Sequence, residues 1–178
     1  MRTIIHDLED TSFLNLNDDD VLVSDADKNC IGCFSCWVKT PFNCIHKDKI
    51  SNNGETILNS DDLIVISRCT YGSYSSKVKR IIERSISYVE PFFTIRNNEI
   101  HHRSRTNKKL NFKIYFYGNN ITEKDKEVSK VFCEANMNNL NTNYPEVYFY
   151  DDYEEMFSIL WHILSMRKMC YKIIVPNF

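Results

Sequence analysis

The residues best suited to chemistry are four cysteines in one short stretch of the chain. They are Cys30, Cys33, Cys36 and Cys44, spaced as C-x2-C-x2-C-x7-C. Three thiols at intervals of three can turn toward one centre, and the fourth, beyond Pro41, can complete the cage of an iron–sulfur cluster. Three alternatives stay open. The first is a structural zinc site, although such sites usually pair two separated C-x2-C units. The others are a thiol–disulfide pair and the packing of small cysteine side chains beside neighbouring aromatic residues.

A second stretch, residues 70–76, combines flat aromatic side chains, a glycine and several hydroxyls. It reads Thr-Tyr-Gly-Ser-Tyr-Ser-Ser and directly follows an apolar run. Its tyrosines can lie against a flat ring, and its backbone N–H groups can bind the polar edge of that ring. An ordinary turn from a strand to a serine-capped helix is the alternative interpretation.

The hydrophobic pattern predicts the elements that position these two stretches. Short apolar runs predict strands at 3–6, 21–23, 63–66, 112–117 and 147–150, with 173–175 as a last strand or a docked tail. Apolar residues at helical spacing predict helices over 78–89, 128–140 and 153–164. Ser75 can cap the first helix, and Thr122 with Asp125 resembles a capping box for the second. The alternation predicts one α/β domain over residues 1–178, with helices on both faces of a parallel sheet.

Five strands in a chain of this length suit a flavodoxin-like, doubly wound sheet. Ligands of such sheets bind beyond the carboxyl ends of the strands, where the strand order reverses. We therefore expect the cysteine stretch and the 70–76 stretch to lie together at that edge.

These motifs together resemble the NAD(P)H-dependent FMN reductase group of flavodoxin-fold proteins. The similarity is strongest to a branch with a C-x-G-C-x-x-C-W-x-x-T-P-x-x-C loop, which overlaps the iron–sulfur flavoproteins. It rests on Cys30 to Cys44 and on residues 71–75, 91–93 and 99–102, and it covers roughly residues 28–120.

The resemblance implies a set of cofactors and residue roles. FMN would be bound by Thr70, Tyr71, Gly72, Ser73, Tyr74 and Ser75, with Gly118 and Asn119 bordering the pocket. NADH or NADPH would supply hydride, and electrons would pass to a small acceptor or another flavin. The cysteine loop would lie close to the flavin and, in the iron–sulfur branch, would hold a [4Fe–4S] cluster. The resemblance also implies a homodimer, and it assigns no catalytic residue.

The loop after the first predicted strand departs from this pattern. Flavodoxin-like proteins hold the FMN phosphate there with small and hydroxyl residues at a helix N-terminus. This chain has Asp7, Glu9 and Asp10 in that loop, and only Thr11 and Ser12 offer hydroxyls. Each carboxylate ~4 Å from a phosphate charge opposes it by about 1 kcal/mol even in water. FMN is therefore held weakly, with its phosphate elsewhere, or flavin binding has been lost.

Several smaller signals have two interpretations. His101 and His102, with Arg103 and Arg105, could meet the phosphates of a nicotinamide cofactor, but a solvated loop or a dimer contact is the simpler explanation. His46 is a further metal-ligand candidate or a surface histidine.

Four cysteines and histidines outside these motifs are interpreted from their position alone. Cys69 leads into the 70–76 stretch, whereas the remaining three are expected to be structural: Cys133, His162 and Cys170.

The composition of the chain also limits the classes of partner and the cellular compartment that we expect. The net charge of −2 gives no indication of a nucleic-acid partner, and no run approaches the roughly 18 apolar residues of a membrane span. Clustered cysteines in a chain with no apparent export signal favour the reducing cytoplasm.

Three hypotheses follow. The leading one is an FMN-dependent NAD(P)H oxidoreductase. The others are a [4Fe–4S] electron-transfer protein, with or without FMN, and a flavodoxin-fold binding protein that has lost FMN.

Overall fold

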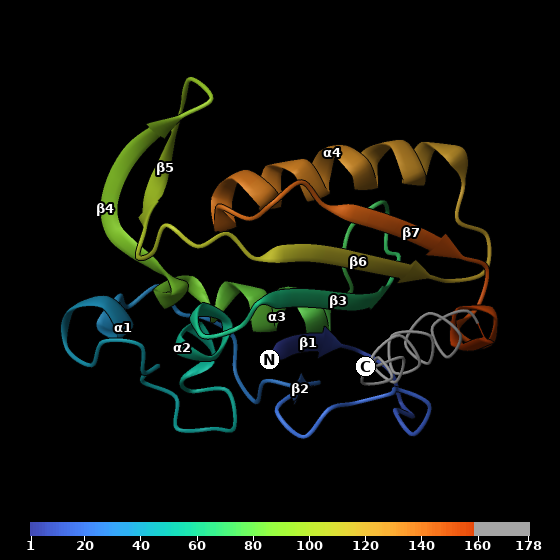
Figure 1. The fold of residues 1–178 in the computed structure, drawn as a ribbon, viewed down its shortest axis with the longest axis horizontal. Coiled ribbons are helices and arrows are strands. Elements are labelled where there is room, and N and C mark those ends of the chain that lie inside the picture. The colour runs from blue at the N-terminus through green and yellow to red at the C-terminus, as the bar shows by residue number, and fades with distance from the viewer. Residues whose placement is uncertain (159–178) are drawn as a thin grey trace, which may run out of the picture.

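A five-stranded parallel sheet forms the centre of the computed structural model, which describes residues 1–158 (Figure 1). Its strands are β1 (Arg2–His6), β2 (Val21–Val23), β3 (Asp62–Arg68), β6 (Asn111–Tyr117) and β7 (Glu146–Tyr150). The order is β2-β1-β3-β6-β7 and every neighbouring pair is parallel. All five predicted strands are thus confirmed, and the order is compatible with a flavodoxin-like fold. The predicted strand at 173–175, the end of the helix predicted over 153–164, His162 and Cys170 lie outside the described residues.

Helices cover the first face of this sheet. They are α2 (Asn53–Leu58), α3 (Ser76–Glu83) and α4 (Glu123–Leu140). Ile57, Ile81 and Cys133 from these helices are buried in one cluster with Val65 and Phe116 of the sheet. The serine cap of α3 and the capping box of α4 both form, and Cys133 is a core residue, as predicted.

The second face has a different cover. Residues 7–20, between β1 and β2, form an irregular loop, and Phe13 and Leu14 of that loop pack against the sheet. Met156, in the helical residues 153–158, is buried in the same cluster. A loop and one helical segment therefore cover the sheet where doubly wound folds usually place a crossover helix.

The helix predicted over 78–89 is too long by six residues. α3 ends at Glu83, and a short 3-10 turn, η1 (Ile86–Tyr88), leads into a hairpin of β4 (Val89–Arg96) and β5 (Glu99–Ser104). Pro91 disfavours helical conformation at the residue before it and cannot donate a helical hydrogen bond. The hairpin projects from the body of the molecule beside one end of α4 (Figure 1).

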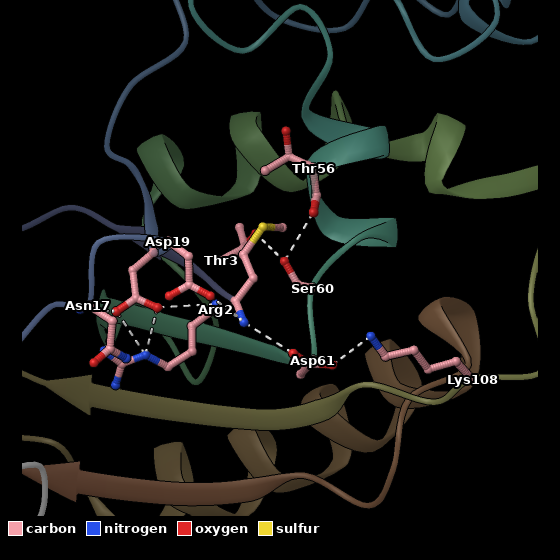
Figure 2. Close-up of polar contacts among 10 residues, drawn as sticks. Arg2, Thr3, Asn17, Asp19, Thr56, Ser60, Asp61 and Lys108 are labelled. Atoms are coloured by element: carbon pink, nitrogen blue, oxygen red, sulfur yellow. Dashed lines mark hydrogen bonds and ion pairs between the residues drawn. The ribbon is translucent and has the colours of Figure 1, made fainter. Parts of the chain in front are cut away.

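Ion pairs link residues at the edge of the sheet where the strands begin (Figure 2). The terminal amino group of Met1 lies 2.9 Å from Asp19 and 3.1 Å from Asp61, and Lys108 lies 2.7 Å from Asp61. Arg2 pairs with Asp20, whose side chain is fully buried. Burial raises the pKa of Asp20, but hydrogen bonds from Arg2 and Asn17 outweigh it and leave the pKa below its ordinary value.

Replacing Asp20 by Asn should leave Arg2 without its partner and lower the free energy of unfolding by about 3 kcal/mol. Because the pKa of Asp20 is depressed in the fold, the pair contributes its stability above the unfolded pKa of an aspartate and loses it as the pH falls through the folded value. Urea unfolding at neutral and acidic pH measures both effects. The exposed Asp18→Asn is the control, with an expected change below about 0.5 kcal/mol, and equal effects of the two variants would contradict the account.

Candidate functional site

A cleft of about 480 Å³ lies at the carboxyl edge of the sheet. The loop after β1, Arg68 at the end of β3, residues 75–77 at the start of α3, Tyr117 and Tyr153 line it. The sheet order reverses between β1 and β3, so the cleft lies at the switch point where doubly wound sheets bind ligands. A second cleft of about 320 Å³ adjoins it, shares Arg68, Tyr117 and Tyr153, and includes Gly118 and Asn119.

The carboxylates of this cleft are partly engaged in hydrogen bonds. Asp7 accepts the backbone N–H of Arg68 at 3.1 and 3.2 Å and the hydroxyl of Tyr117 at 3.1 Å. Burial, followed by the charge of Asp7, raises the pKa of Tyr117 well above its usual value, so its hydroxyl stays protonated. Asp10 accepts the N–H and the hydroxyl of Ser12 at 2.8 and 3.0 Å, and these bonds lower its pKa.

Two cations face the same cleft. The Arg68 guanidinium lies over the ring of Tyr117, 5.5 Å from its centroid, and Lys77 lies at the start of α3. Asp7, Glu9 and Asp10 also line the cleft, so three negative charges meet two positive ones. This balance suits an uncharged or cationic group better than a phosphate.

The residues predicted to bind FMN are spread over four environments: an exposed turn, the main cleft, the adjoining cleft and the core. Thr70 and Ser73 exchange backbone hydrogen bonds of 2.9 and 3.1 Å in a tight turn, and Tyr71 is 90% exposed. Gly72 has φ +72° and packs on α4 so closely that a Cβ atom would lie 2.7 Å from Val128. Ser75 lines the main cleft, and Gly118 and Asn119 line the adjoining one.

Tyr74 lies in the core. Its ring contacts Phe116 and Phe132, with centroids 5.6 and 4.8 Å away, and only 1% of the residue is exposed. Burial raises its pKa well above the usual value of a tyrosine. Its ring is therefore packed between the sheet and α4, away from either cleft.

The cysteine loop lies at the other end of α3, so the expectation that it accompanies the 70–76 stretch is wrong. After β2 the chain runs along α3: Arg80 donates to the carbonyl of Ala26 at 3.0 Å, and Arg84 donates to that of Lys28 at 3.3 Å. The caps of α3, Ser75 and Arg84, are about 13 Å apart at 1.5 Å per residue. Figure 1 shows the short α1 (Ser35–Val38) of this loop near the base of the hairpin, away from the carboxyl ends of β6 and β7.

All four cysteines of the loop line one cavity. Cys30 and Cys33 are exposed, whereas Cys36 and Cys44 are half-buried. The N–H and hydroxyl of Ser35 lower the pKa of Cys33. Burial raises the pKa of Cys36, and the charges of Cys44, Cys30 and Cys33 raise it further. Ionisation of Cys36 therefore depends on its burial and on the charges of the other three cysteines.

Apolar side chains and a histidine complete the walls of the cavity. Its other walls include Ile31, Phe34, Ile45, Ile86 and His46. In residues 1–158, no three His, Cys, Asp or Glu side chains are set as ligands of one ion. A zinc ion with bonds of about 2.3 Å draws its sulfurs within about 4 Å of one another, whereas a cluster holds each thiolate on a separate iron. The cavity has a volume of about 50 Å³.

Arg84 closes the base of the cysteine loop. Its side chain is fully buried, and it pairs with Asp48, with one bond of 2.7 Å. It also donates to the carbonyls of Lys28 and His46 at 3.3 and 3.4 Å, and its positive charge faces the Cys44 thiol. Lys28 and His46 flank the four cysteines, so one guanidinium holds both ends of the loop.

Trp37 anchors the middle of the same loop. Its indole N–H donates to the carbonyl of Val89 at 2.9 Å, and its ring lies 5.5 Å from Phe34 and 4.7 Å from His102, measured between centroids. Arg105 lies over the ring of Phe42 at 4.6 Å. Part of the predicted histidine–arginine group therefore packs against the cysteine loop.

Sequence reasoning missed Arg84. The sequence shows only that Arg84 follows Arg80 by four residues in a short amphipathic helix. This spacing does not distinguish a buried arginine from an exposed one.

Comparison with protein-family models and with curated proteins finds no match for the chain. Within residues 1–158, no helix has the length and apolar character needed to cross a membrane.

Replacing Arg84 by Lys keeps the positive charge but removes the planar fork that binds Asp48 and two carbonyls at once. We expect the base of the loop to open and Cys44 to react with a thiol reagent at least about tenfold faster, the equivalent of ~1.4 kcal/mol of lost protection. Mass spectrometry of timed alkylation measures this rate. Arg80→Lys, which affects one carbonyl bond, is the matched control, and unchanged reactivity of Cys44 in Arg84→Lys would show that Arg84 does not hold the loop.

Proposed function

We propose that this chain is an electron-transfer protein that binds a [4Fe–4S] cluster through Cys30, Cys33, Cys36 and Cys44. The observation that carries the proposal is that the side chains of these four cysteines line one cavity. Burial, followed by the charges of Cys44, Cys30 and Cys33, raises the pKa of Cys36, and bound cationic iron would stabilise its thiolate. A bound cluster would supply one-electron transfer without a proton.

The protein groups around the thiols have defined roles in this proposal. Arg84 would offset part of the negative charge of the ligand set, and its bonds would fix the position of Cys44. The N–H of Ser35 would stabilise the Cys33 thiolate. Cys30 and Cys33 are exposed, which would place a cluster near the surface, where electrons can enter and leave.

A second candidate is the FMN-dependent NAD(P)H oxidoreductase of a flavodoxin-like, doubly wound dimer. The cleft at the switch point of the sheet favours it, because Arg68, Lys77 and the start of α3 could meet a phosphate there. Asp7, Glu9 and Asp10 oppose a phosphate at the same place, and for that reason we rank this candidate second. A binding protein that has lost FMN would keep the same fold and cleft.

Replacing Cys33 by Ala removes one proposed iron ligand. We expect iron-reconstituted Cys33→Ala to lose at least half of its bound iron and the broad visible absorbance of a cluster. Iron analysis and an anaerobic spectrum measure this loss. Cys69→Ala, outside the loop, is the control and should retain both, and full iron retention by Cys33→Ala would refute the cluster.

Charge variants of the main cleft test the second candidate. If FMN binds there, Asp10→Asn should tighten binding and Arg68→Ala should weaken it, each by roughly five- to tenfold, because ~1 kcal/mol of charge interaction with the phosphate is changed. FMN fluorescence titration measures both affinities. Glu127→Gln, on α4 outside the cleft, is the control. An absence of FMN binding by the wild type and by Asp10→Asn would support loss of the flavin.

A further inference from the structure

A third cleft, of about 340 Å³, lies between the end of α3, η1, the β4–β5 hairpin and the last turns of α4. It contains none of the four loop cysteines and no residue of the main cleft at the carboxyl edge. Its walls are mostly apolar: Ile82, Ile86, Val89, Phe93, Ile100 and Leu140. Its volume is within the range of small-molecule sites and exceeds ordinary packing defects.

Large apolar side chains stand exposed at its rim. Phe93 is 69% exposed and Ile100 is 75% exposed, and both belong to the projecting hairpin (Figure 1). Exposed apolar side chains gathered around a cleft indicate a surface that a ligand covers.

Two polar atoms beneath this apolar lining have no hydrogen-bond partner in the described part of the chain. They are the hydroxyl of Tyr88, a residue only 1% exposed, and Nδ1 of His102. An unpaired buried polar atom costs about 1–3 kcal/mol, so two around one cleft require an explanation. Burial raises the pKa of Tyr88 to about 12, so its hydroxyl is neutral and can donate a hydrogen bond.

The charges around the cleft argue against an anion. His101 is already bound to Glu99 at 3.0 Å and to Asn139 at 3.2 Å. Of the described residues that line the cleft, Glu83 alone carries a permanent charge, and it is negative. The charge of Arg96 also acts on the Tyr88 hydroxyl, but both terminal nitrogens of Arg96 already donate to the carbonyls of Asn138 and His102. Nothing in the lining offers an anion the cation that would balance it.

We propose that this cleft binds an uncharged, mainly apolar aromatic molecule through a single oxygen that hydrogen-bonds the hydroxyl of Tyr88. Phe93 and Ile100 cover the apolar body of the molecule, and His102 Nδ1 is the other unpaired polar atom among the residues that line the cleft. The inference is independent of the proposed cluster, because the cleft uses none of its ligands.

Calorimetry with three matched probes tests the site: 2-naphthol, naphthalene, which lacks the oxygen, and 2-naphthoate, which adds a negative charge. The full chain should bind 2-naphthol at least about tenfold more tightly than either of the others, because a buried hydroxyl left unpaired disfavours the analogue that lacks the oxygen. Tyr88→Phe should remove the preference for 2-naphthol over naphthalene without weakening naphthalene binding. It should also leave the protein at least as stable, because it deletes an unpaired buried hydroxyl.

Two further variants test whether the probes bind in this cleft. Tyr71→Phe, at a tyrosine 90% exposed, should bind as the wild type does, whereas Ile100→Glu, at the exposed rim, should weaken both neutral probes without affecting folding. Absence of saturable 2-naphthol binding, equal affinity for naphthalene, or unchanged 2-naphthol binding in Tyr88→Phe would each overturn the proposal.

Discussion

The buried guanidinium of Arg84 determines where the cysteines of this protein lie. It pairs with Asp48 and binds the carbonyls of Lys28 and His46, which flank the cysteine loop on both sides. Both terminal nitrogens of the buried guanidinium are hydrogen-bonded, whereas Nε has no partner among the described residues, and the bonds of the terminal nitrogens hold the loop base in one arrangement. Because Arg84 caps the far end of α3, the loop is fixed about 13 Å along the helix from the cleft at its start. The two candidate sites are therefore physically separate.

This separation changes how the two sites are interpreted. In the resemblance to FMN reductases, the cysteine loop and the flavin loop serve one centre. Here the cysteines lie beside η1 and the hairpin, while the switch-point cleft has three carboxylates against two cations. The cysteine cavity and the switch-point cleft share no lining residue, and the three carboxylates of the cleft disfavour a phosphate there.

The elements of the sheet could be predicted because each carries a local signal. Apolar runs marked all five strands, and Ser75 and Thr122 marked the starts of α3 and α4. The end of α3 could not be predicted from periodicity, because Ile86 and Val89 continue the helical spacing while Pro91 imposes extended backbone before it. The hairpin that follows was missed for the same reason.

The candidate sites were predictable only in part. The spacing of the four cysteines in the sequence predicts that they lie together, because thiols a few residues apart can meet within one loop. Their distance from the 70–76 stretch depends on contacts between distant residues, such as Arg80 with Ala26, which leave no local pattern. Tyr74 illustrates the same limit, because its burial against Phe116 and Phe132 depends on how α4 packs.

We expect the four cysteines to form one cluster site. The most direct test is anaerobic reconstitution of the wild-type chain with iron and sulfide, followed by metal and acid-labile sulfide analysis and by electron paramagnetic resonance before and after reduction. The account predicts about four iron and four sulfide ions per chain and a signal that appears when the cluster accepts one electron. A colourless protein that retains neither iron nor sulfide would contradict it.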